Sequence, residues 1–280
     1  KKFTNKNFLK IKKKIGFLLT NDQNKALNDI DNDLASESKM FRILQGDVGS
    51  GKTIVALISS LNVIESAYQV AFMSPTEILS NQHYELAKKI FPTNVKIDLI
   101  TSKTDFKKKR EIQKKIKNNS LDMIFGTHSL FQKNVSFAKL GYIIIDEQHK
   151  FGVKQRKSLS DKGGVNCDIL LMSATPIPRT LTMTIYGDMD LSVIKEKPKE
   201  RKEVKTYSKI NTKVDEVINF VKKEINNDNQ IFWVCPLIEE SKKIDHQSAI
   251  KKYNFLNNIF PNMVAIIHGN VSSEEKNKVL

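Results

Sequence analysis

The chain has 280 residues, is 40% hydrophobic and carries a formal net charge of +15 at pH 7. This length and this hydrophobic content predict a packed core in one large domain, or in about one and a half ordinary ones. The only cysteines, Cys167 and Cys235, each lie in an apolar run, which argues against a disulfide framework and a zinc site. We therefore expect a protein of a reducing compartment, the cytoplasm.

The start of the chain, Lys1 to Lys14, is basic like a signal peptide, but the apolar stretch behind it is far too short. No apolar run approaches the length of a membrane span. We therefore expect no membrane partner.

The positive charge fits a polyanionic partner, because Lys and Arg neutralise phosphates and release counterions. A general drift toward lysine explains it as well, since only five of the 46 basic residues are Arg. Basic runs such as residues 107–110 are more often solvated faces than binding sites. Charge alone leaves both explanations open.

The first pattern in chain order is Phe17-Leu18-Leu19-Thr20-Asn21-Asp22-Gln23, which precedes a helical stretch. The amide of Gln23 has the donor and the acceptor needed to read adenine, and Phe17 could stack on the base. Alternatively, Thr20 or Asn21 caps the helix beside an apolar staple. The local sequence does not separate these interpretations.

The next pattern, Gly46-Asp47-Val48-Gly49-Ser50-Gly51-Lys52-Thr53, fits the phosphate-binding loop G-x-x-x-x-G-K-[ST]. A strand-like run, residues 41–44, precedes it, and residues 54–58 can open a helix behind it. In such a loop, backbone N–H groups and the helix dipole surround an anion. Lys52 would reach the terminal phosphates and Thr53 would hold Mg²⁺, so the pattern predicts a nucleotide site.

Apolar runs alternate with helical patterns, which predicts an α/β fold: a mostly parallel sheet with helices on both faces. Strands are expected at Arg42–Leu44, Val70–Met73, Val95–Ile100, Met123–Phe125, Tyr142–Ile145 and Ile169–Met172. Helices are expected at Thr53–Ala67, Glu77–Phe91 and Phe106–Asn118.

Two carboxylates, Asp146 and Glu147, end the strand that begins at Tyr142. Beside a phosphate loop, Asp146 is expected to hold Mg²⁺ through water, opposite Thr53. Glu147 would orient and deprotonate the water that attacks the γ-phosphate. The alternative is a polar pair that merely ends a strand.

A second polar group, Ser173, Ala174 and Thr175, ends the strand expected beside the Asp146 strand. Its hydroxyls either sense the γ-phosphate or cap the following turn. The sequence leaves both roles open.

Residues 195–203 are charged and almost free of apolar side chains, so we expect them to be a linker between a first domain, residues 1–194, and a second unit, residues 204–280. In the second unit, strands are expected at Val204–Tyr207, Ile231–Cys235 and Val264–Ile267, and helices along the stripe Val214, Val217, Ile218, Val221 and Ile225 and near Ser241–Ile259. Three strands make a poor sheet. We therefore expect the chain to be a fragment cut inside its second unit.

Several phrases resemble those of RecG-type ATP-dependent DNA helicases of superfamily 2. Besides the phosphate loop, they are Ser74-Pro75-Thr76-Glu77-Ile78-Leu79 with Gln82-His83, Gly126-Thr127-His128-Ser129-Leu130, Asp146-Glu147-Gln148-His149-Lys150-Phe151-Gly152-Val153, Ser173-Ala174-Thr175-Pro176-Ile177-Pro178-Arg179-Thr180-Leu181 and Trp233-Val234-Cys235-Pro236-Leu237-Ile238-Glu239-Glu240-Ser241. The resemblance covers almost the whole chain.

This resemblance implies two RecA-like lobes that close on ATP and step along DNA, with a wedge domain that splits branched junctions. The first lobe would be residues 1–194, and residue 204 would begin a truncated second lobe. ATP and Mg²⁺ would be the cofactors. The partner would be branched DNA, such as stalled forks and Holliday junctions, and the protein would act as a monomer in recombination and repair.

The resemblance also implies roles for matching positions. One set would lie along DNA-facing loops: Thr76, Glu77, Gly126, Thr127 and His128. A second set would couple nucleotide state to lobe movement: Gln148, His149, Ser173, Ala174, Thr175 and Arg179. The arginines that complete the ATP site from the second lobe would lie outside this chain, so the fragment alone is expected to turn over little ATP.

Three alternatives remain beside this interpretation. A transcription-repair coupling translocase shares the phrase Thr175-Pro176-Ile177-Pro178-Arg179-Thr180 but typically has Glu at the position of Gln148. The chain as cut could be an ATP-binding or DNA-binding module without turnover. An RNA remodelling helicase would carry a different phrase at residues 146–149.

Overall fold

The computed structural model describes residues 11, 15–131, 135–147, 167–175, 189–197, 204–235, 242–268, 271, 275, 278 and 279. The chain divides into two compact units, Lys1–Glu203 and Val204–Leu280. Each unit has its own cluster of buried apolar side chains.

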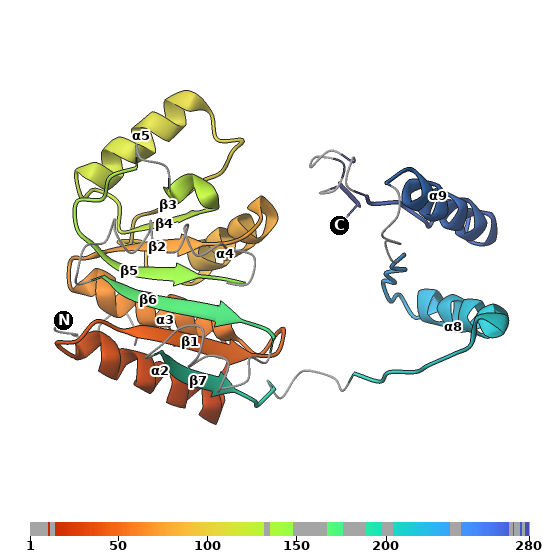
Figure 1. The fold of residues 1–280 in the computed structure, drawn as a ribbon, viewed down its shortest axis with the longest axis horizontal. Helices are drawn as coiled ribbons and strands as arrows, with labels where there is room; N and C mark the ends of the chain where they lie inside the picture. The colour runs from red at the N-terminus through yellow and green to blue at the C-terminus, as the bar shows by residue number, and fades with distance from the viewer. Residues whose placement is uncertain are drawn as a thin grey trace. The chain divides into compact units, whose positions relative to one another are not determined.

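The described part of the first unit is built on a seven-stranded sheet in which all neighbouring strands run parallel (Figure 1). The strands are β1 (Phe41–Gly46), β2 (Gln69–Met73), β3 (Ile97–Ile100), β4 (Met123–Gly126), β5 (Leu140–Ile145), β6 (Asp168–Ser173) and β7 (Asp190–Ile194). Their order across the sheet is β3-β4-β2-β5-β6-β1-β7. The predicted α/β class with a parallel sheet is therefore confirmed.

Both faces of the sheet are covered. In β5, Tyr142 and Ile144 belong to one buried apolar cluster, whereas Ile143 and Ile145 belong to a second cluster. Successive side chains of a strand point to opposite faces, so these clusters lie on the two sides of the sheet. A strand buried on both faces has a continuous apolar sequence, which is why β5 was recognisable.

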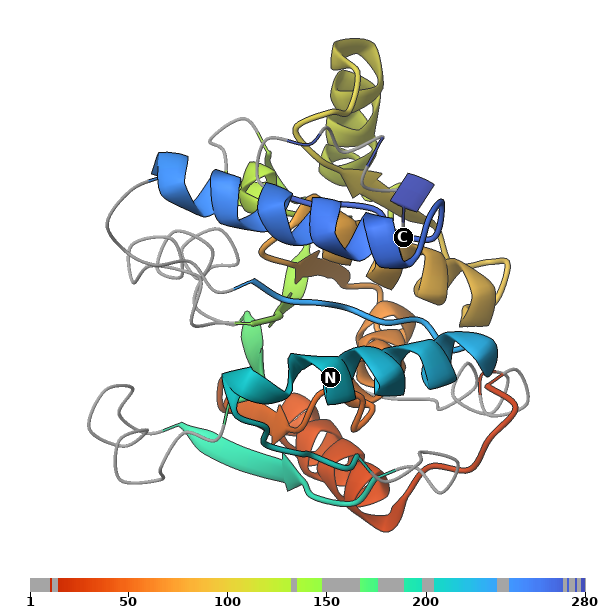
Figure 2. The ribbon, with the colours of Figure 1, turned by 90° about the vertical axis from the view of Figure 1, so that its right-hand side faces the viewer.

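Helices pack on each face. The cluster that holds Tyr142 contains side chains from α2 (Asn21–Ala35), α3 (Lys52–Glu65) and α4 (Glu77–Ile90). On the other face, α5 (Phe106–Lys117) buries Ile112 and Ile116. The sheet thus lies between helical layers, with α5 at its β3 end and α2 at its β7 end (Figure 1 and Figure 2).

Local sequence explains where these helices begin. Thr20 and Gln23 form a capping box at the start of α2, so Thr20 and not Asn21 is the cap. The side chain of Thr76 caps α4 in the same manner. By contrast, α3 begins after Gly51, which adopts a left-handed conformation and has no side chain to cap the helix.

The predicted strands and helices of the first unit are all present, within a few residues of their predicted ends. The structure also contains one strand that was not predicted, β7. It is an edge strand that pairs with β1, and only its Ser192 and Ile194 are buried. A short, mostly exposed strand lacks the apolar run by which the other strands were recognised.

The three strands predicted in the second unit are wrong. Residues 204–207, 231–235 and 264–267 lie outside any strand, and Val204, Phe232 and Val234 are 67, 72 and 81% exposed. An apolar run becomes a strand only when a neighbouring strand accepts its backbone hydrogen bonds. Among the described residues of this unit no segment does so.

The two helices predicted in the second unit are present as α8 (Val214–Asn226) and α9 (Lys242–Ile259), and a 3-10 turn, η3 (Asn211–Lys213), precedes them. Ile218 and Val221, from the predicted stripe of α8, form a small core with Leu256 and Phe260. Across the ranges that the structure describes, no helix combines the length and the hydropathy of a membrane span.

Candidate active site

The carboxyl ends of five adjacent strands bring the predicted site together. β4, β2, β5, β6 and β1 are consecutive in the sheet and parallel, so their carboxyl ends share one edge. The phosphate loop follows β1, the acidic pair follows β5, and the helix cap Thr76 follows β2. Open parallel sheets bind their ligands at this edge.

The backbone conformation of the phosphate loop requires its glycines. Gly49 and Gly51 have φ angles of 78° and 89°, in the left-handed region. A Cβ at Gly46 would lie only 2.5 Å from Ser50 Oγ and 3.0 Å from the carbonyl oxygen of Ile194. Among the described residues, the buried Ser50 Oγ has no hydrogen-bond partner. Backbone that no side chain covers at the glycines, the unpartnered Ser50 hydroxyl and the N-terminus of α3 together fit a bound phosphate.

Lys52, the first residue of α3, is buried at this loop. Its Nζ donates to the carbonyl oxygens of Gly46 at 2.5 Å and of Asp47 at 3.0 Å. Burial lowers the pKa of Lys52, while the carboxylates of Asp146, Glu147 and Asp47 oppose this shift. The ammonium therefore lies within the field of the acidic pair. Thr53 follows it in α3.

Asp146 is held by two contacts. Its Oδ1 accepts a hydrogen bond from Glu147 N at 3.0 Å, and its Oδ2 lies 2.8 Å from His83 Nε2. Glu147 has a φ of 51°, in a region that residues other than glycine seldom adopt. Such strained backbone concentrates at functional sites. The pair thus offers a fixed oxygen ligand suited to Mg²⁺ and a second carboxylate beside it.

The turn after β6 lies between the acidic pair and the phosphate loop, because β6 separates β5 from β1. Ser173 Oγ contacts Thr175 Oγ1 at 3.0 Å and the carbonyl oxygen of Thr175 at 3.3 Å. Ala174 is partly exposed between them. The hydroxyls bond to their own turn, as the capping alternative predicts, and the sensing of a γ-phosphate stays a prediction.

Gln23 contacts the phosphate loop directly. Its Nε2 donates to the carbonyl oxygen of Ser50 at 2.7 Å, and its Oε1 accepts from Thr20 N at 2.9 Å. Its side chain is buried, so both ends of the amide bond within the protein. Reading of adenine by Gln23 stays a prediction.

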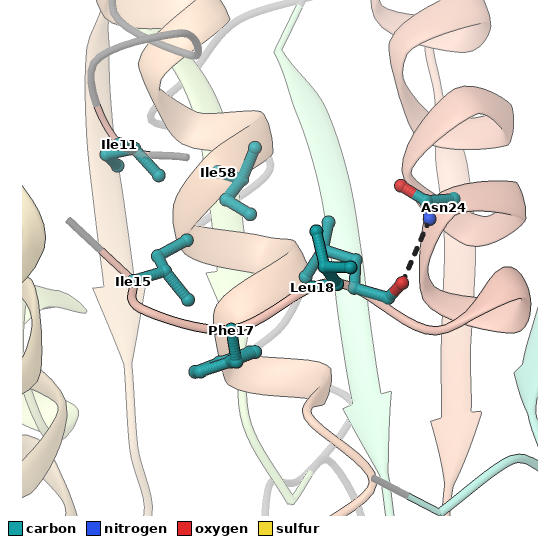
Figure 3. Close-up of a pocket in the computed structure, with 7 residues that line it drawn as sticks. Ile11, Ile15, Phe17, Leu18, Asn24 and Ile58 are labelled. Atoms are coloured by element: carbon teal, nitrogen blue, oxygen red, sulfur yellow. Dashed lines mark hydrogen bonds between the residues drawn. The ribbon is translucent and has the colours of Figure 1, made fainter. Parts of the chain in front are cut away.

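Phe17 lines a cavity of about 240 Å³ near the start of α2 (Figure 3). Ile11, Ile15, Leu18 and Ile58 supply most of its apolar wall. Asn24, also at the wall, donates to the carbonyl oxygen of Leu19 at 3.2 Å. Phe17 is 46% exposed and therefore remains accessible to a planar ligand.

Hydrogen bonds join the loops that are predicted to face DNA. Glu77 Oε1 accepts from the backbone N–H of Ser102 at 2.9 Å and also from its hydroxyl. The carbonyl oxygen of Gly126 accepts from Ser74 N at 3.0 Å, and Thr127 follows at the end of β4. The segments after β2, β3 and β4 therefore form one connected rim. DNA contact by this rim stays a prediction.

Several predicted residues cannot be placed. Gln148, His149 and Arg179 lie outside the described residues, and so does the side chain of His128. Their predicted roles stay predictions.

The sequence predicted no role for His83 or Ser102. His83 lies in one of the phrases that resemble RecG-type helicases, but that phrase alone did not give it a function. Helical spacing from Thr76 could have placed His83 on a definite face of α4, but its contact with Asp146 spans 63 positions of the chain. Ser102 lies in a polar loop with no motif. Contacts between distant segments leave no local pattern.

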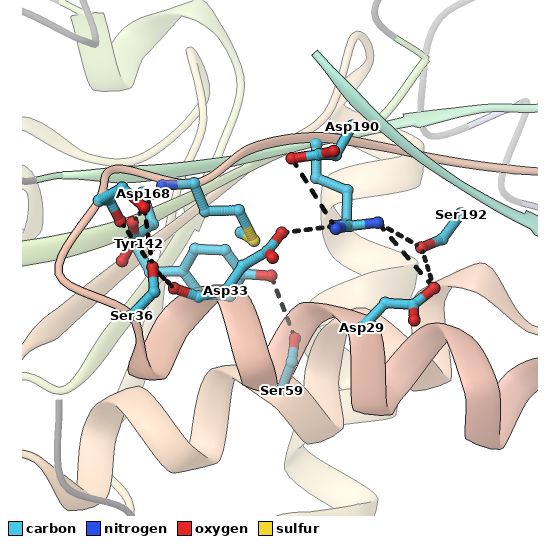
Figure 4. A network of polar contacts seen from close by, with 11 residues as sticks. Asp29, Asp33, Ser36, Ser59, Tyr142, Asp168, Asp190 and Ser192 are labelled. Atoms are coloured by element: carbon cyan, nitrogen blue, oxygen red, sulfur yellow. Dashed lines mark hydrogen bonds and ion pairs between the residues drawn. The ribbon is translucent and has the colours of Figure 1, made fainter. Parts of the chain in front are cut away.

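Arg42 is a third residue without a predicted role, and Figure 4 shows its partners Asp29, Asp33, Asp190 and Ser192. Its guanidinium contacts Asp33 Oδ2 at 2.6 Å and Ser192 Oγ at 2.8 Å, and Ser192 donates to Asp29 Oδ2 at 2.8 Å. A longer ion pair of 3.9 Å reaches Asp190. This network joins β1, β7 and α2, so Arg42 holds the outer strand β7 and the helix α2 against β1, the strand that leads into the phosphate loop.

A parallel sheet with a phosphate loop after β1 and an acidic pair after β5 defines a RecA-like P-loop nucleotide-binding lobe. Residues 20–184 match the model of the DEAD/DEAH box helicase family, and the chain belongs to this family. The predicted resemblance is also confirmed by relatives named ATP-dependent DNA helicase RecG. The chain is 44% identical to the one from Bacillus subtilis over 282 aligned residues and 45% identical to the one from Thermotoga maritima over 271.

These matches cover 100% and 96% of this chain but only 41% and 35% of the relatives. Among solved structures, one of RecG bound to a three-way DNA junction matches with a TM-score of 0.81 and 40% identity, over 100% of this chain and 36% of that one. An RNA-bound Mss116p structure, at 18% identity and a TM-score of 0.65, shares the fold over 98% of this chain and 60% of its own.

Proposed function

We propose that the protein is an ATP-dependent DNA translocase that remodels branched DNA. The observation that carries this proposal is the convergence of Lys52, Asp146 and the loop glycines at one edge of the sheet. The similarity to RecG, including a structure of RecG on a three-way DNA junction, supports branched DNA as the substrate class.

The chain's own residues suggest how ATP would be held. Backbone N–H groups at residues 46–53 would surround the phosphates, and the Lys52 ammonium would exchange its bonds to Gly46 and Asp47 for phosphate oxygens. Thr53 and Asp146 are the oxygen ligands that fit Mg²⁺, which when bound would neutralise charge on the phosphates. Glu147 would orient the attacking water and accept its proton.

The charge of α5 supports a DNA partner. This helix carries seven basic residues and one acidic residue: Lys107, Lys108, Lys109, Arg110, Lys114, Lys115 and Lys117 with Glu111. At the other end of the sheet, α2 carries four aspartates and one lysine. A uniform drift toward lysine would enrich both helices, so the asymmetry favours a selected basic surface.

The test is ATP hydrolysis by the full-length protein with no DNA, with linear duplex and with a forked or four-way junction of equal nucleotide content. We expect junctions to raise kcat several-fold more than linear duplex does, because only they offer a branch point. Equal stimulation by both would contradict a branch-specific function while leaving DNA-dependent hydrolysis intact.

A further inference from the structure

The contact between His83 and Asp146 links two regions of the proposed motor. His83 lies on α4, is 8% exposed, and places its Nε2 2.8 Å from Asp146 Oδ2. Its ring packs on Phe72 of β2, with 4.8 Å between the ring centroids. The imidazole is therefore held in place by packing on one side and by the carboxylate on the other.

This contact controls the orientation of the Asp146 carboxylate. Oδ1 accepts from Glu147 N, so each oxygen has a partner from a different part of the fold. An ionised carboxylate only accepts hydrogen bonds, so Nε2 carries the proton that it donates. Groups that hold a metal ligand in this way typically contribute 10–100-fold to metal affinity.

The first turn of α4 lies in the rim predicted to face DNA. Thr76 caps the helix, and Glu77 in its first turn is bonded to Ser102. His83 follows Thr76 by two helical turns, a rise of about 10 Å. A displacement of the rim would therefore move the imidazole through a continuous helix.

We propose that His83 is a positioning residue: it orients Asp146 for Mg²⁺ and carries movement of the rim at Thr76 and Glu77 to the nucleotide site. This inference rests on the proposed function. It adds a connection that runs along α4 to Asp146 and does not pass through Gln148, His149 or the turn after β6, which the resemblance assigns to coupling. A histidine that only fills the core would leave the Mg²⁺ dependence unchanged when replaced.

The test compares His83→Ala with His83→Gln, whose amide nitrogen can take the place of Nε2, in the full protein. Ser80→Ala is the matched control, because Ser80 is buried on the same helix and its hydroxyl lacks a hydrogen-bond partner within the described ranges. The readouts are the affinity for a fluorescent ADP with and without Mg²⁺, thermal stability, and the ratio of DNA-stimulated to basal ATPase activity.

For His83→Ala we expect ADP affinity without Mg²⁺ to stay within about twofold of wild type, and the concentration of Mg²⁺ for half-maximal effect to rise about 10-fold or more. The ratio of DNA-stimulated to basal activity should fall as well. His83→Gln should recover most of both properties, and Ser80→Ala should match wild type.

Wild-type Mg²⁺ dependence and DNA stimulation in a folded His83→Ala protein would overturn the inference. If His83→Ala does not fold, the Mg²⁺ dependence of His83→Gln is compared with that of His83→Asn, since only the longer amide reaches the position of Nε2. Equal Mg²⁺ dependence in these two variants would equally refute positioning. Failure of the wild-type protein itself to bind nucleotide or hydrolyse ATP would instead refute the proposed function.

Discussion

Gln23 Nε2 donates to the carbonyl oxygen of Ser50 at 2.7 Å, which ties the first turn of α2 to the phosphate loop. The same amide closes the capping box with Thr20. One side chain therefore both begins a helix and braces the loop. The local sequence suggested Thr20 as a cap but indicated neither of these contacts of Gln23.

Replacing Gln23 with alanine should loosen the loop. We expect ATP affinity to fall several-fold and the free energy of unfolding to fall by about 1–2 kcal/mol, because a cap and a buried hydrogen bond are lost together. Isothermal titration with ATP and chemical denaturation measure both. Asn24→Ala is the control, since within the described ranges the Asn24 side chain bonds to the carbonyl oxygens of Leu19 and Thr20 and not to the loop. An equal loss of ATP affinity in this control would show that the brace has no special role.

Variants of Lys52 and Glu147 should affect different steps, ATP binding and ATP hydrolysis respectively. Lys52→Ala should abolish ATP binding, because no other buried cation is described at the loop. Glu147→Gln should retain binding but lose kcat by several orders of magnitude, since an amide cannot accept the proton of the attacking water. Equilibrium binding and steady-state hydrolysis distinguish these outcomes. Wild-type turnover in Glu147→Gln would identify another residue as the base.

Asp31 should make stability depend on pH. Burial raises the pKa of Asp31 to about 6, and its hydrogen bond from Asn62 only partly offsets this. Because the folded state binds this proton more tightly than the unfolded state, the contribution of Asp31 is favourable below about pH 4 and is lost as the pH rises to 6. Asp31→Asn should therefore stabilise the fold by about 1–2 kcal/mol at pH 8.

Thermal unfolding at pH 4 and at pH 8 tests this expectation. The gain from Asp31→Asn should shrink toward zero at the lower pH, where the wild-type carboxyl is already neutral. A gain of the same size at both pH values would show that the carboxylate charge is not the cause.

The basic helix α5 should contribute to DNA affinity through its first turns. β3 ends at Ile100 on the carboxyl edge, and Lys107 and Arg110 follow nearby, whereas Lys114 and Lys117 lie toward the far end of the helix. Lys107→Glu with Arg110→Glu should weaken junction binding and lower the slope of log affinity against log salt by about two. Lys114→Glu with Lys117→Glu changes the charge equally and should lower the slope by less than about one.

Fluorescence anisotropy at several salt concentrations gives both slopes. Arg110 also stacks over the ring of Phe106, with 4.3 Å from its guanidinium carbon to the ring centroid, which pre-orients it along the helix. Equal effects of the two double variants would show that general charge, and not the edge of the sheet, governs binding.

The parts of the fold that the sequence predicted correctly are those with strong local signals. β5 is a continuous apolar run because both of its faces are buried, and the phosphate loop is a contiguous motif whose glycines occupy positions that disfavour a side chain. β7 was missed because an edge strand held by Arg42 needs few apolar residues. In the second unit, apolar runs such as residues 231–235 suggested strands, but strand formation depends on a partner that local sequence does not contain.

By itself, the sequence determined the order of strands and helices from β1 to β6, the phosphate loop at Gly46 to Thr53 and the acidic pair Asp146 and Glu147, because the signal for each of these lies in consecutive residues. Only the tertiary structure decided that His83 meets Asp146 and that Gln23 supports Ser50. The physical reason is that a parallel sheet must order its strands by packing and hydrogen bonding between distant segments. That ordering, and not the local sequence, brings the nucleotide loop, the acidic pair and the rim after β2 to one edge.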